Sequence, residues 1–432
     1  MNEYPPQPKQ EFWQPYLVQP QQFQPAIQQP QYPQQPPKRS KGKLFLATIA
    51  CGALVLVIII VAVITRIVGS NLSSGKNVAA VGQKLTAATP SGILLGPQPC
   101  PLTVQSAAHW KKIIALSTAQ KVEGVLCGYL MGVPSLQTVV KVRYGGAKDL
   151  LDIDVYTNIT SAQPSRVFSL QGLPHGDVSI SNYNTLMTGE IELKPNRDAS
   201  VASTQVQQDL YREFKWSDSA GTLVQITFPG FFPDLTRYQA EYEQNQVNTG
   251  QGYQQWRLSA VSTAQNFAEF VLGWNPNAPT TVLSGGGIHD AKALILVKNP
   301  SADNATIKIS LSRLELNTDG GIWEVTGVAT DGITISSPKD AQQLTSPVQV
   351  TGAETTFAGK PTTIKVFDHD RAEIGLATVN VSSDTGKSNI AMSVSFSSNF
   401  QGEMQEGIIA LYSYTANHVI DGAVMVKVLL SA

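Results

Sequence analysis

Polar and apolar residues are distributed unevenly along the 432-residue chain, and three patterns follow one another from the N-terminus. Residues 1–37 hold few aliphatic side chains, residues 44–64 hold no charged side chain, and apolar and polar positions alternate from about residue 100 onward. Alternation with a period of two is the pattern of a half-buried β-strand. We therefore expect a polar tail, an apolar run and a β-rich remainder.

The N-terminal tail, residues 1–43, is rich in proline and glutamine. Residues 1–37 contain 10 prolines and 12 glutamines, and such a stretch buries too little apolar surface to offset the entropy of ordering. The composition predicts a disordered tail with polyproline II bias. Its scattered aromatic residues have two interpretations, a solvated tail or contacts with a cytoplasmic partner.

The apolar run extends from Leu44 to Ile64 and contains no charged, proline, asparagine or glutamine residue. As a helix it would be about 30 Å long, which matches the hydrocarbon core of a bilayer. A cleaved signal peptide is the weaker alternative, because its apolar core has only about 7–15 residues. The run predicts an uncleaved signal-anchor helix over 44–66, with the lipid bilayer as partner of residues 44–64.

Four lysine and arginine residues lie within 38–43, directly before the apolar run. The positive-inside rule then places the N-terminus in the cytoplasm and the C-terminal domains outside the cell. Residues 67–99 are rich in glycine, serine, alanine and asparagine and are expected to form a stalk.

Beyond the stalk, the patterns predict three outer domains. Residues 100–205 read as a β-rich domain, and residues 206–330 as an α+β domain. In the second domain we expect a helix capped by Asp234 and another from about Ser259 to Leu272. Three strands are expected after them, at 291–298, 306–316 and 321–329.

The last domain, residues 331–432, shows short alternating segments separated by turn residues. This pattern is typical of an immunoglobulin-like β-sandwich. The fold class expected is thus a single-pass membrane protein whose outer part is β-rich, with mixed α+β domains followed by that sandwich. The expected strands are 333–336, 348–352, 362–367, 374–381, 390–396, 407–414 and 423–430.

Residues 332–430 carry a series of short phrases, which are Ser337-Pro338, Ser346-Pro347, Val350-Thr351-Gly352-Ala353, Phe357, Phe367-Asp368, Glu406–Ser413 and Asp421-Gly422. Together they resemble the bacterial spore-germination immunoglobulin-like domain known as Gmad2. The family pattern has an acidic residue where this chain has Ala358. The resemblance implies a non-catalytic β-sandwich of the bacterial cell envelope. Upstream, Phe228–Gln244 and Gly320–Val328 resemble stretches of uncharacterised membrane-anchored bacterial proteins, which implies no activity.

Three cysteines are present, and Cys51 falls inside the apolar run. Cys100 and Cys127 lie in the expected outer part, where an oxidising environment permits a disulfide. Two cysteines left over in one exported domain usually pair, so we expect a disulfide between them, with two free thiols as the alternative.

Two loops hold side chains with candidate chemistry, and each has a plainer explanation. The first comprises Gly285, Gly286, Gly287, His289 and Asp290; its amides would approach a ligand, or the loop simply connects two elements. The second is Asp368-His369-Asp370 with Glu373, which suits either a Ca²⁺ loop or a tight turn. The turn is the favoured reading.

Asp152 and Asp154 share one face of an expected strand, where solvent exposure is the ordinary explanation for acidic side chains.

Catalytic signatures are missing from the sequence: there is no zinc-binding His pair and no nucleophile elbow. We expect no enzyme, no cofactor and no metal site. The net charge of −1 lacks the basic surplus of a nucleic-acid binder. The favoured function is a non-enzymatic binding or scaffolding module on the outer face, linked to sporulation, germination or the cell wall, with a wall or protein partner. The alternative is an envelope hydrolase or ligand sensor with its site near Gly285–Asp290.

Overall fold

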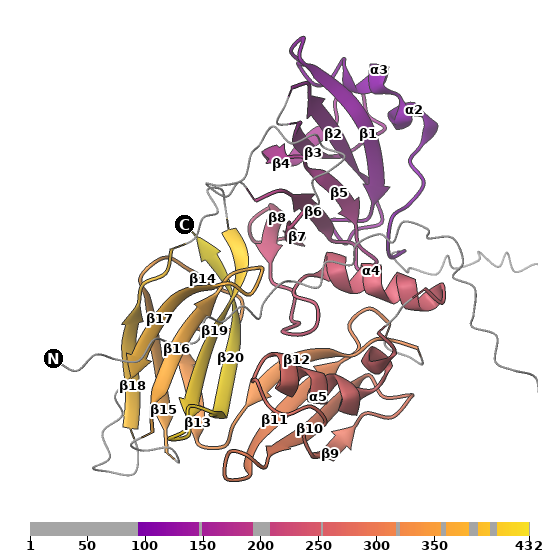
Figure 1. Ribbon diagram of the computed structural model, residues 1–432. Helices are drawn as coiled ribbons and strands as arrows, with labels where there is room; N and C mark the ends of the chain where they lie inside the picture. Colours follow the sequence, from indigo (N-terminus) through magenta and orange to yellow (C-terminus); the bar gives the residue numbers. More distant parts are fainter. Residues whose placement is uncertain are drawn as a thin grey trace, which may run out of the picture. The chain divides into compact units, whose positions relative to one another are not determined.

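The computed structural model describes residues 94–431 except 147–148, 193–207, 252–253, 317–319, 356–359, 380–387 and 398–403. The tail, the apolar run and the stalk up to residue 93 lie outside the described residues, so the membrane span and its orientation stay predictions. Among the described residues, no helix has both the length and the apolar composition needed to cross a bilayer. Residues 92–432 form one compact unit, which Figure 1 shows as several β-sheets with few helices.

Two four-stranded antiparallel sheets make up the first domain, with strand orders β1-β2-β3-β4 and β5-β6-β7-β8. Their facing side chains, among them Ile153, Leu186 and Phe214, form one apolar core. The strands are β1 Gln120–Gly128, β2 Gln137–Tyr144, β3 Leu150–Thr157, β4 Ser165–Pro174, β5 Asp177–Ile180, β6 Leu186–Glu190, β7 Leu210–Ser217 and β8 Thr222–Ile226.

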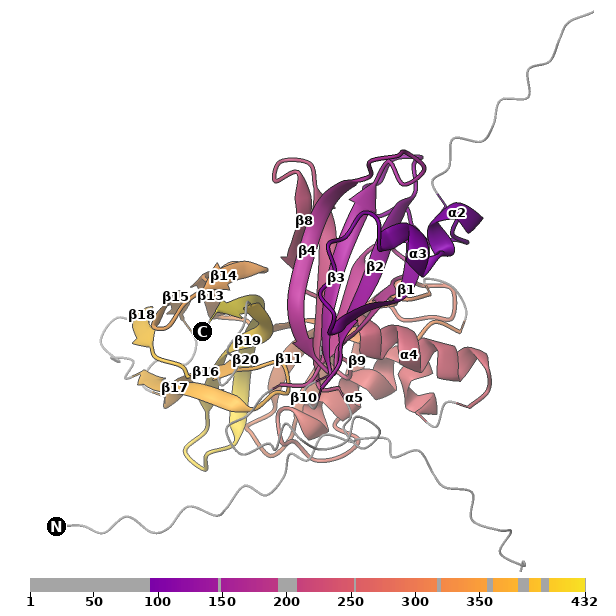
Figure 2. The same ribbon diagram turned by 90° about the horizontal axis from the view of Figure 1, so that it is seen from above.

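The outer face of the β1–β4 sheet is also covered, by the short helices α2 (Leu102–Gln105) and α3 (Ala107–Trp110). Figure 2 shows both helices beside β1 and β2. Trp110 packs there against the β2 and β3 side chains Val140, Val142 and Tyr156. The middle strands β2 and β3 are therefore buried on both faces.

Because β3 has two buried faces, the expected exposure of its acidic residues is wrong. Asp152 and Asp154 are both buried. Asp152 accepts hydrogen bonds from the Tyr144 hydroxyl at 2.7 Å and the Gly172 amide at 2.8 Å. Asp154 is paired with Arg166 at 3.3 Å. Partners from neighbouring strands offset the cost of burying these carboxylates.

The limits of the first domain differ from the predicted 100–205. Strand β7 pairs with β6, with Phe214 opposite Leu186, so the domain continues through β8. At the other end, the Gln98 amide donates to the Cys127 carbonyl at 2.8 Å, so the last residues of the expected stalk contact the domain. Pairing between residues distant in the chain decided these limits, and local composition carries no record of it.

The second domain has an antiparallel sheet of order β12-β11-β10-β9 with helices packed on it. Helix α5 contacts all four strands, and Figure 1 shows it lying across the sheet. Its side chains Ala264, Phe267 and Ala268 enter a core with Ile295 and Trp323. The elements are α4 Arg237–Asn248, η2 Gln255–Leu258, α5 Ala260–Phe270, β9 Thr280–Gly285, β10 Lys292–Asn299, β11 Ala305–Ser312 and β12 Glu324–Ala329.

Two details of this domain differ from expectation. Strand β9 had no counterpart among the expected strands; its side chains are mostly exposed, so no buried face marks it in the sequence. The cap of α4 is Thr236 rather than Asp234, in a reciprocal capping box with Gln239. Asp234 instead pairs with Arg257.

The third domain is a β-sandwich of two sheets, β13-β15-β18 and β14-β20-β19-β16-β17. Side chains from both sheets, including Val350, Ile364 and Leu411, form its core. All seven expected strands are present near their predicted positions, and β14 is additional. The strands are β13 Ile333–Ser337, β14 Gln342–Leu344, β15 Val348–Glu354, β16 Thr362–Phe367, β17 Glu373–Val379, β18 Ser388–Val394, β19 Met404–Tyr414 and β20 Ile420–Ser431.

The five-stranded sheet of the sandwich is buried on its other face as well. Ile408, Tyr412 and Met425 join the core of the second domain beside Phe232 and Val325. The expected boundary at 330/331 therefore separates two sets of strands that share one core.

Candidate functional site

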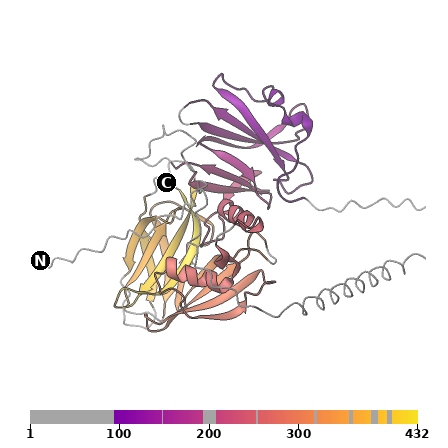
Figure 3. The same cartoon turned by 45° about the vertical axis from the view of Figure 1, so that its right-hand side comes forward.

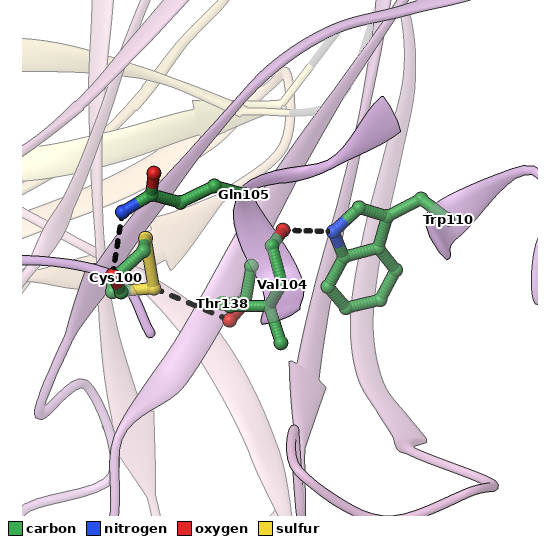
Figure 4. Close-up of a disulfide and its surroundings, with 6 residues drawn as sticks. Cys100, Val104, Gln105, Trp110 and Thr138 are labelled. Atoms are coloured by element: carbon green, nitrogen blue, oxygen red, sulfur yellow. Dashed lines mark hydrogen bonds between the residues drawn. A yellow bond between two sulfur atoms is a disulfide. The ribbon is translucent and has the colours of Figure 1, made fainter. Parts of the chain in front are cut away.

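Cys100 and Cys127 are joined by a disulfide, with their Cα atoms 5.2 Å apart. The bond links the segment before α2 to strand β1, and Figure 4 shows its surroundings. Gln105 donates to the Cys100 carbonyl at 2.7 Å, and the Trp110 indole donates to the Val104 carbonyl at 2.7 Å. The disulfide ties this segment to the sheet, and the two hydrogen bonds hold α2 and α3 to the residues just before them.

The glycine-rich loop from Gly285 to Asp290 lies on the surface, in the connection from β9 to β10. Asp290 accepts a hydrogen bond from the Gly287 amide at 2.8 Å, which closes the turn. Ile288 is 67 % exposed, and His289 is exposed too. The inward-facing His289 on which the hydrolase or sensor interpretation depended is not found.

The loop between β16 and β17 contains the second candidate set. Asp368 accepts hydrogen bonds from the amides of Asp370 and Ala372 at 2.9 and 2.8 Å, which is the tight turn favoured above. Glu373 pairs with Lys365 at 2.7 Å. The carboxylates of Asp368 and Glu373 are each engaged in these contacts and are therefore not directed at a shared cation.

A polar hollow of about 250 Å³ opens beside the β10–β11 turn. Its charged residues include Asp331, Lys360 and Asp421. Lys360 pairs with Asp421 at 2.6 Å, and Lys308 pairs with Asp331 at 2.7 Å. Three of the four charged residues that line the hollow are thus paired within the protein, and Asp303 is the fourth.

The main concentration of buried charge surrounds residues 228–237, the chain between β8 and α4. We call this stretch the junction segment, because side chains from all three domains bind to it. Its backbone pairs with β12: the Phe231 amide donates to the Val325 carbonyl, and the Val325 amide donates to the Phe232 carbonyl, both at 2.7 Å.

Arg257 lies at the centre of the charge cluster and is only 1 % exposed. Its guanidinium binds Asp234 and, at 2.5 Å, Glu324. Glu243 of α4 lies 3.7 Å away. Burial by itself would lower the pKa of Arg257, but the acidic neighbours outweigh it and raise that pKa. The ion pairs of Arg257 with Asp234 and Glu324 thus join η2, the junction segment and β12.

The C-terminal sandwich holds the same segment through Lys427 and Glu406, both buried. Lys427 donates to the carbonyls of Gly230 and Leu235 at 3.1 and 2.8 Å and pairs with Glu406 at 3.1 Å. Glu406 also accepts from the Phe228 amide at 3.0 Å. Burial raises the pKa of Glu406 to about 7 and lowers the pKa of Lys427, each opposed by the partner's charge.

The first domain is joined to the second through Arg237, the first residue of α4. Its guanidinium binds Glu213 of β7 at 2.6 Å and Glu315 at 2.9 Å. Helix α4 adds a stacked pair, Tyr238 on Tyr211. Figure 3 shows α4 between the β5–β8 sheet and the second domain.

Two stretches already singled out in the sequence lie at this junction. Phe228–Gln244 and Gly320–Val328, the two stretches that resemble segments of other membrane-anchored proteins, contact each other here. Besides the Phe231 and Phe232 pairing, Gln244 accepts from the Ile322 amide at 2.9 Å. The buried charges were missed. One signal in the sequence was Lys427, which stands among the apolar residues of β20. A lone lysine in such a strand must have a buried partner or face solvent.

Comparisons with known proteins add little. No protein-family model matches the chain, and no curated protein matches it. Latent dimeric PorU from Porphyromonas gingivalis aligns with 68 % of this chain and 31 % of its own, at 7 % identity and a TM-score of 0.20. A trimeric ectodomain of the C. elegans fusion protein EFF-1 aligns with 69 % of each chain, at 10 % identity and a TM-score of 0.15. Scores this low carry no argument about fold or function.

Proposed function

We propose that this chain is a non-enzymatic, membrane-anchored protein of the bacterial cell envelope, whose outer domains act as a binding or scaffolding module. The anchor is the apolar run 44–64, with the N-terminus in the cytoplasm. The outer module ends in an immunoglobulin-like sandwich of the Gmad2 type. A wall polymer or an envelope protein is the expected partner, in a setting of wall or sporulation biology.

The Cys100–Cys127 disulfide is the observation that carries the proposal. Disulfides form and persist in oxidising compartments and are rare in the bacterial cytoplasm. The bonded cysteines lie on the C-terminal side of the apolar run, in the part of the chain that the charge rule assigns to the outside. An exported first domain accounts for both features.

The junction segment supports a scaffolding role. Ion pairs and hydrogen bonds from all three domains meet on residues 228–237, so the domains are held at fixed positions within residues 92–432. Relative motion between domains is the default unless their interface is large and apolar, and here the second domain and the sandwich also share one apolar core. A fixed arrangement suits a module that presents the surfaces of several domains to a partner at set positions relative to one another.

The test is a thiol-accessibility experiment on the full-length protein in intact bacterial cells. Cells are quenched in acid, and the denatured protein is treated with a maleimide of high mass, with and without prior reduction. We expect one adduct without reduction, at Cys51, and three after it. The matched control, Cys100→Ser with Cys127→Ser, should give one adduct in both cases.

Three adducts before reduction would place the first domain in a reducing compartment and end the proposal. The enzymatic question needs a separate measurement. A defined turnover by the purified protein on a wall polymer, absent from a denatured sample, would contradict the non-enzymatic part alone.

A further inference from the structure

Glu192, His369 and Asp370 form a cluster on the side of the molecule where the first domain meets the C-terminal sandwich. Glu192 follows β6, whereas His369 and Asp370 belong to the β16–β17 turn. One potential metal-ligating atom from each lies within 4.8 Å of the other two, the one such trio among the residues that the structure describes. The cluster thus combines an imidazole with two carboxylates from distant parts of the chain.

The distances are close to those of a metal site. His369 Nε2 lies 3.6 Å from Asp370 Oδ1 and 4.0 Å from Glu192 Oε2. Ligands bound tetrahedrally at about 2.0–2.1 Å lie about 3.3 Å apart. Side-chain rotations that move each of the three atoms by less than about 1 Å would therefore bring them within bonding distance of one ion.

The imidazole is oriented for this role by a second contact. His369 is buried, and its Nδ1 contacts the amide oxygen of Gln405. The same oxygen faces the His369 backbone amide at 3.5 Å, which supports its assignment as an acceptor. A proton on Nδ1 then leaves a lone pair on the neutral ring at Nε2, and metal-binding histidines are commonly held in this way.

His369 Nε2 is buried and makes no hydrogen bond to any described residue. In a neutral ring its lone pair faces two carboxylates, and a cation bound between them would stabilise this arrangement. A buried side chain directed into a group of anionic oxygens is the second observation that a cluster of acidic residues alone would lack.

The backbone around the cluster is fixed independently. The hydrogen bonds of Asp368 define the turn that presents His369 and Asp370. On the other side, the Glu192 amide donates to Asp209 at 2.8 Å. The Asp370 side chain is 28 % exposed, so solvent reaches the cluster from one side. This leaves an entry path for an ion.

We propose that Glu192, His369 and Asp370 bind one divalent transition-metal ion, with Zn²⁺ as the best match. An imidazole nitrogen with carboxylate oxygens suits Zn²⁺, whereas Ca²⁺ and Mg²⁺ select oxygen ligands. The ion would bridge the first domain and the sandwich at a point separate from the junction segment, and it would hold the two together. This goes beyond the scaffolding proposal and does not depend on it.

The test uses the full-length protein, stripped of metal with a chelator and titrated with Zn²⁺ by calorimetry. We expect one equivalent to bind, and Co²⁺ to give the visible absorption of a low-coordinate nitrogen and oxygen site. Gln405→Leu should weaken binding about 10- to 100-fold through loss of the outer contact. Glu192→Gln, His369→Gln and Asp370→Asn should weaken it more, and an excess of Ca²⁺ should not compete.

The matched control is His289→Gln, which removes an exposed histidine and should leave the affinity unchanged. Circular dichroism checks the fold of each variant; if His369→Gln fails to fold, Asp370→Asn at its partly exposed position decides the question. The proposal is wrong if the wild-type protein binds no Zn²⁺, as expected of a protonated histidine paired with two carboxylates. It is also wrong if the ligand variants keep the wild-type affinity.

Discussion

The core of the first domain and the junction segment bury their side chains to a similar degree, yet by different chemistry. Between the β1–β4 and β5–β8 sheets the interior is apolar, built from residues such as Ile153, Leu186 and Phe214. Around residues 228–237 the interior contains Arg257, Lys427 and their acidic partners. The stability of the first interior depends on how well its apolar side chains fit together, whereas that of the second depends on the presence of every charged partner.

This difference affects how each region would fail. Loss of a methyl group from an apolar core costs transfer and cavity free energy, and neighbouring side chains relax into part of the space. Loss of one member of a buried ion pair leaves an uncompensated charge, which relaxation does not neutralise. We therefore expect the junction to be the more sensitive of the two.

The largest effect is expected for Arg257→Met. The substitution leaves Asp234 and Glu324 buried without their cation, and we expect the free energy of unfolding to fall by about 3–5 kcal/mol. Urea unfolding followed by circular dichroism measures it. Adding Asp234→Leu and Glu324→Leu to the variant removes the orphaned carboxylates and should recover much of the loss. If the single substitution costs under about 1 kcal/mol, the contrast between the regions disappears.

A smaller loss is expected for Ile153→Ala in the first domain. Ile153 is fully buried between the two sheets, and its truncation should cost about 3 kcal/mol by the same assay. Ile153→Val serves as a control and should cost about 1 kcal/mol. A loss for Ile153→Ala that exceeds the loss for Arg257→Met would reverse the proposed order of sensitivity.

The pH dependence of stability offers a third comparison. Burial raises the pKa of Glu315 to about 8 from 4.5, against the opposing charge of Arg237. The folded state therefore keeps this proton to a higher pH than the unfolded chain does, and unfolding releases it between about pH 4.5 and 8. The free energy of unfolding should fall as pH rises through that window. Glu315→Gln cannot ionise, so its urea midpoints at pH 5, 6.5 and 8 should vary less. Equal slopes in the two proteins would contradict this.

The smallest effect is expected at the surface pair of Lys308 and Asp331. The Asp331 side chain is 82 % exposed, so water screens the pair despite its 2.7 Å separation. Lys308→Ala should change the free energy of unfolding by about 1 kcal/mol or less, and added salt should reduce the effect further. A loss comparable to that of Arg257→Met would show that burial does not separate the two kinds of ion pair.

Much of the fold was predictable where one face of a strand meets solvent. The seven strands of the C-terminal sandwich follow an alternation that the sequence displays, as in Thr362–Phe367. Helix α5 was equally legible from its apolar spacing. Alternation does not report burial where both faces of a strand are buried, as in β3, and the burial of Asp152 was therefore missed. It is also uninformative where nearly all side chains are exposed, as in β9, and that strand was missed.

Candidate sites were harder to predict for a related reason. Asp368-His369-Asp370 drew attention as neighbours in sequence, yet the turn uses Asp368 structurally and directs His369 and Asp370 toward Glu192, 177 positions earlier in the chain. The Gly285–Asp290 loop has suggestive composition, but its exposure removes the expected cavity. The spacing of residues in the sequence shows which of them are neighbours in the chain, but it does not show which side chains contact each other across domains.

By itself, the sequence determined most strands of the C-terminal sandwich and helix α5, because these follow a short-range periodicity bounded by turn residues. It also placed the cysteines close enough for a disulfide. Only the tertiary structure decided that β7 and β8 complete the first domain, that Arg257 and Lys427 are buried, and that Glu192 meets His369. Each of these depends on contacts between residues far apart in the chain, and such contacts form only when the apolar faces of separate elements have packed together.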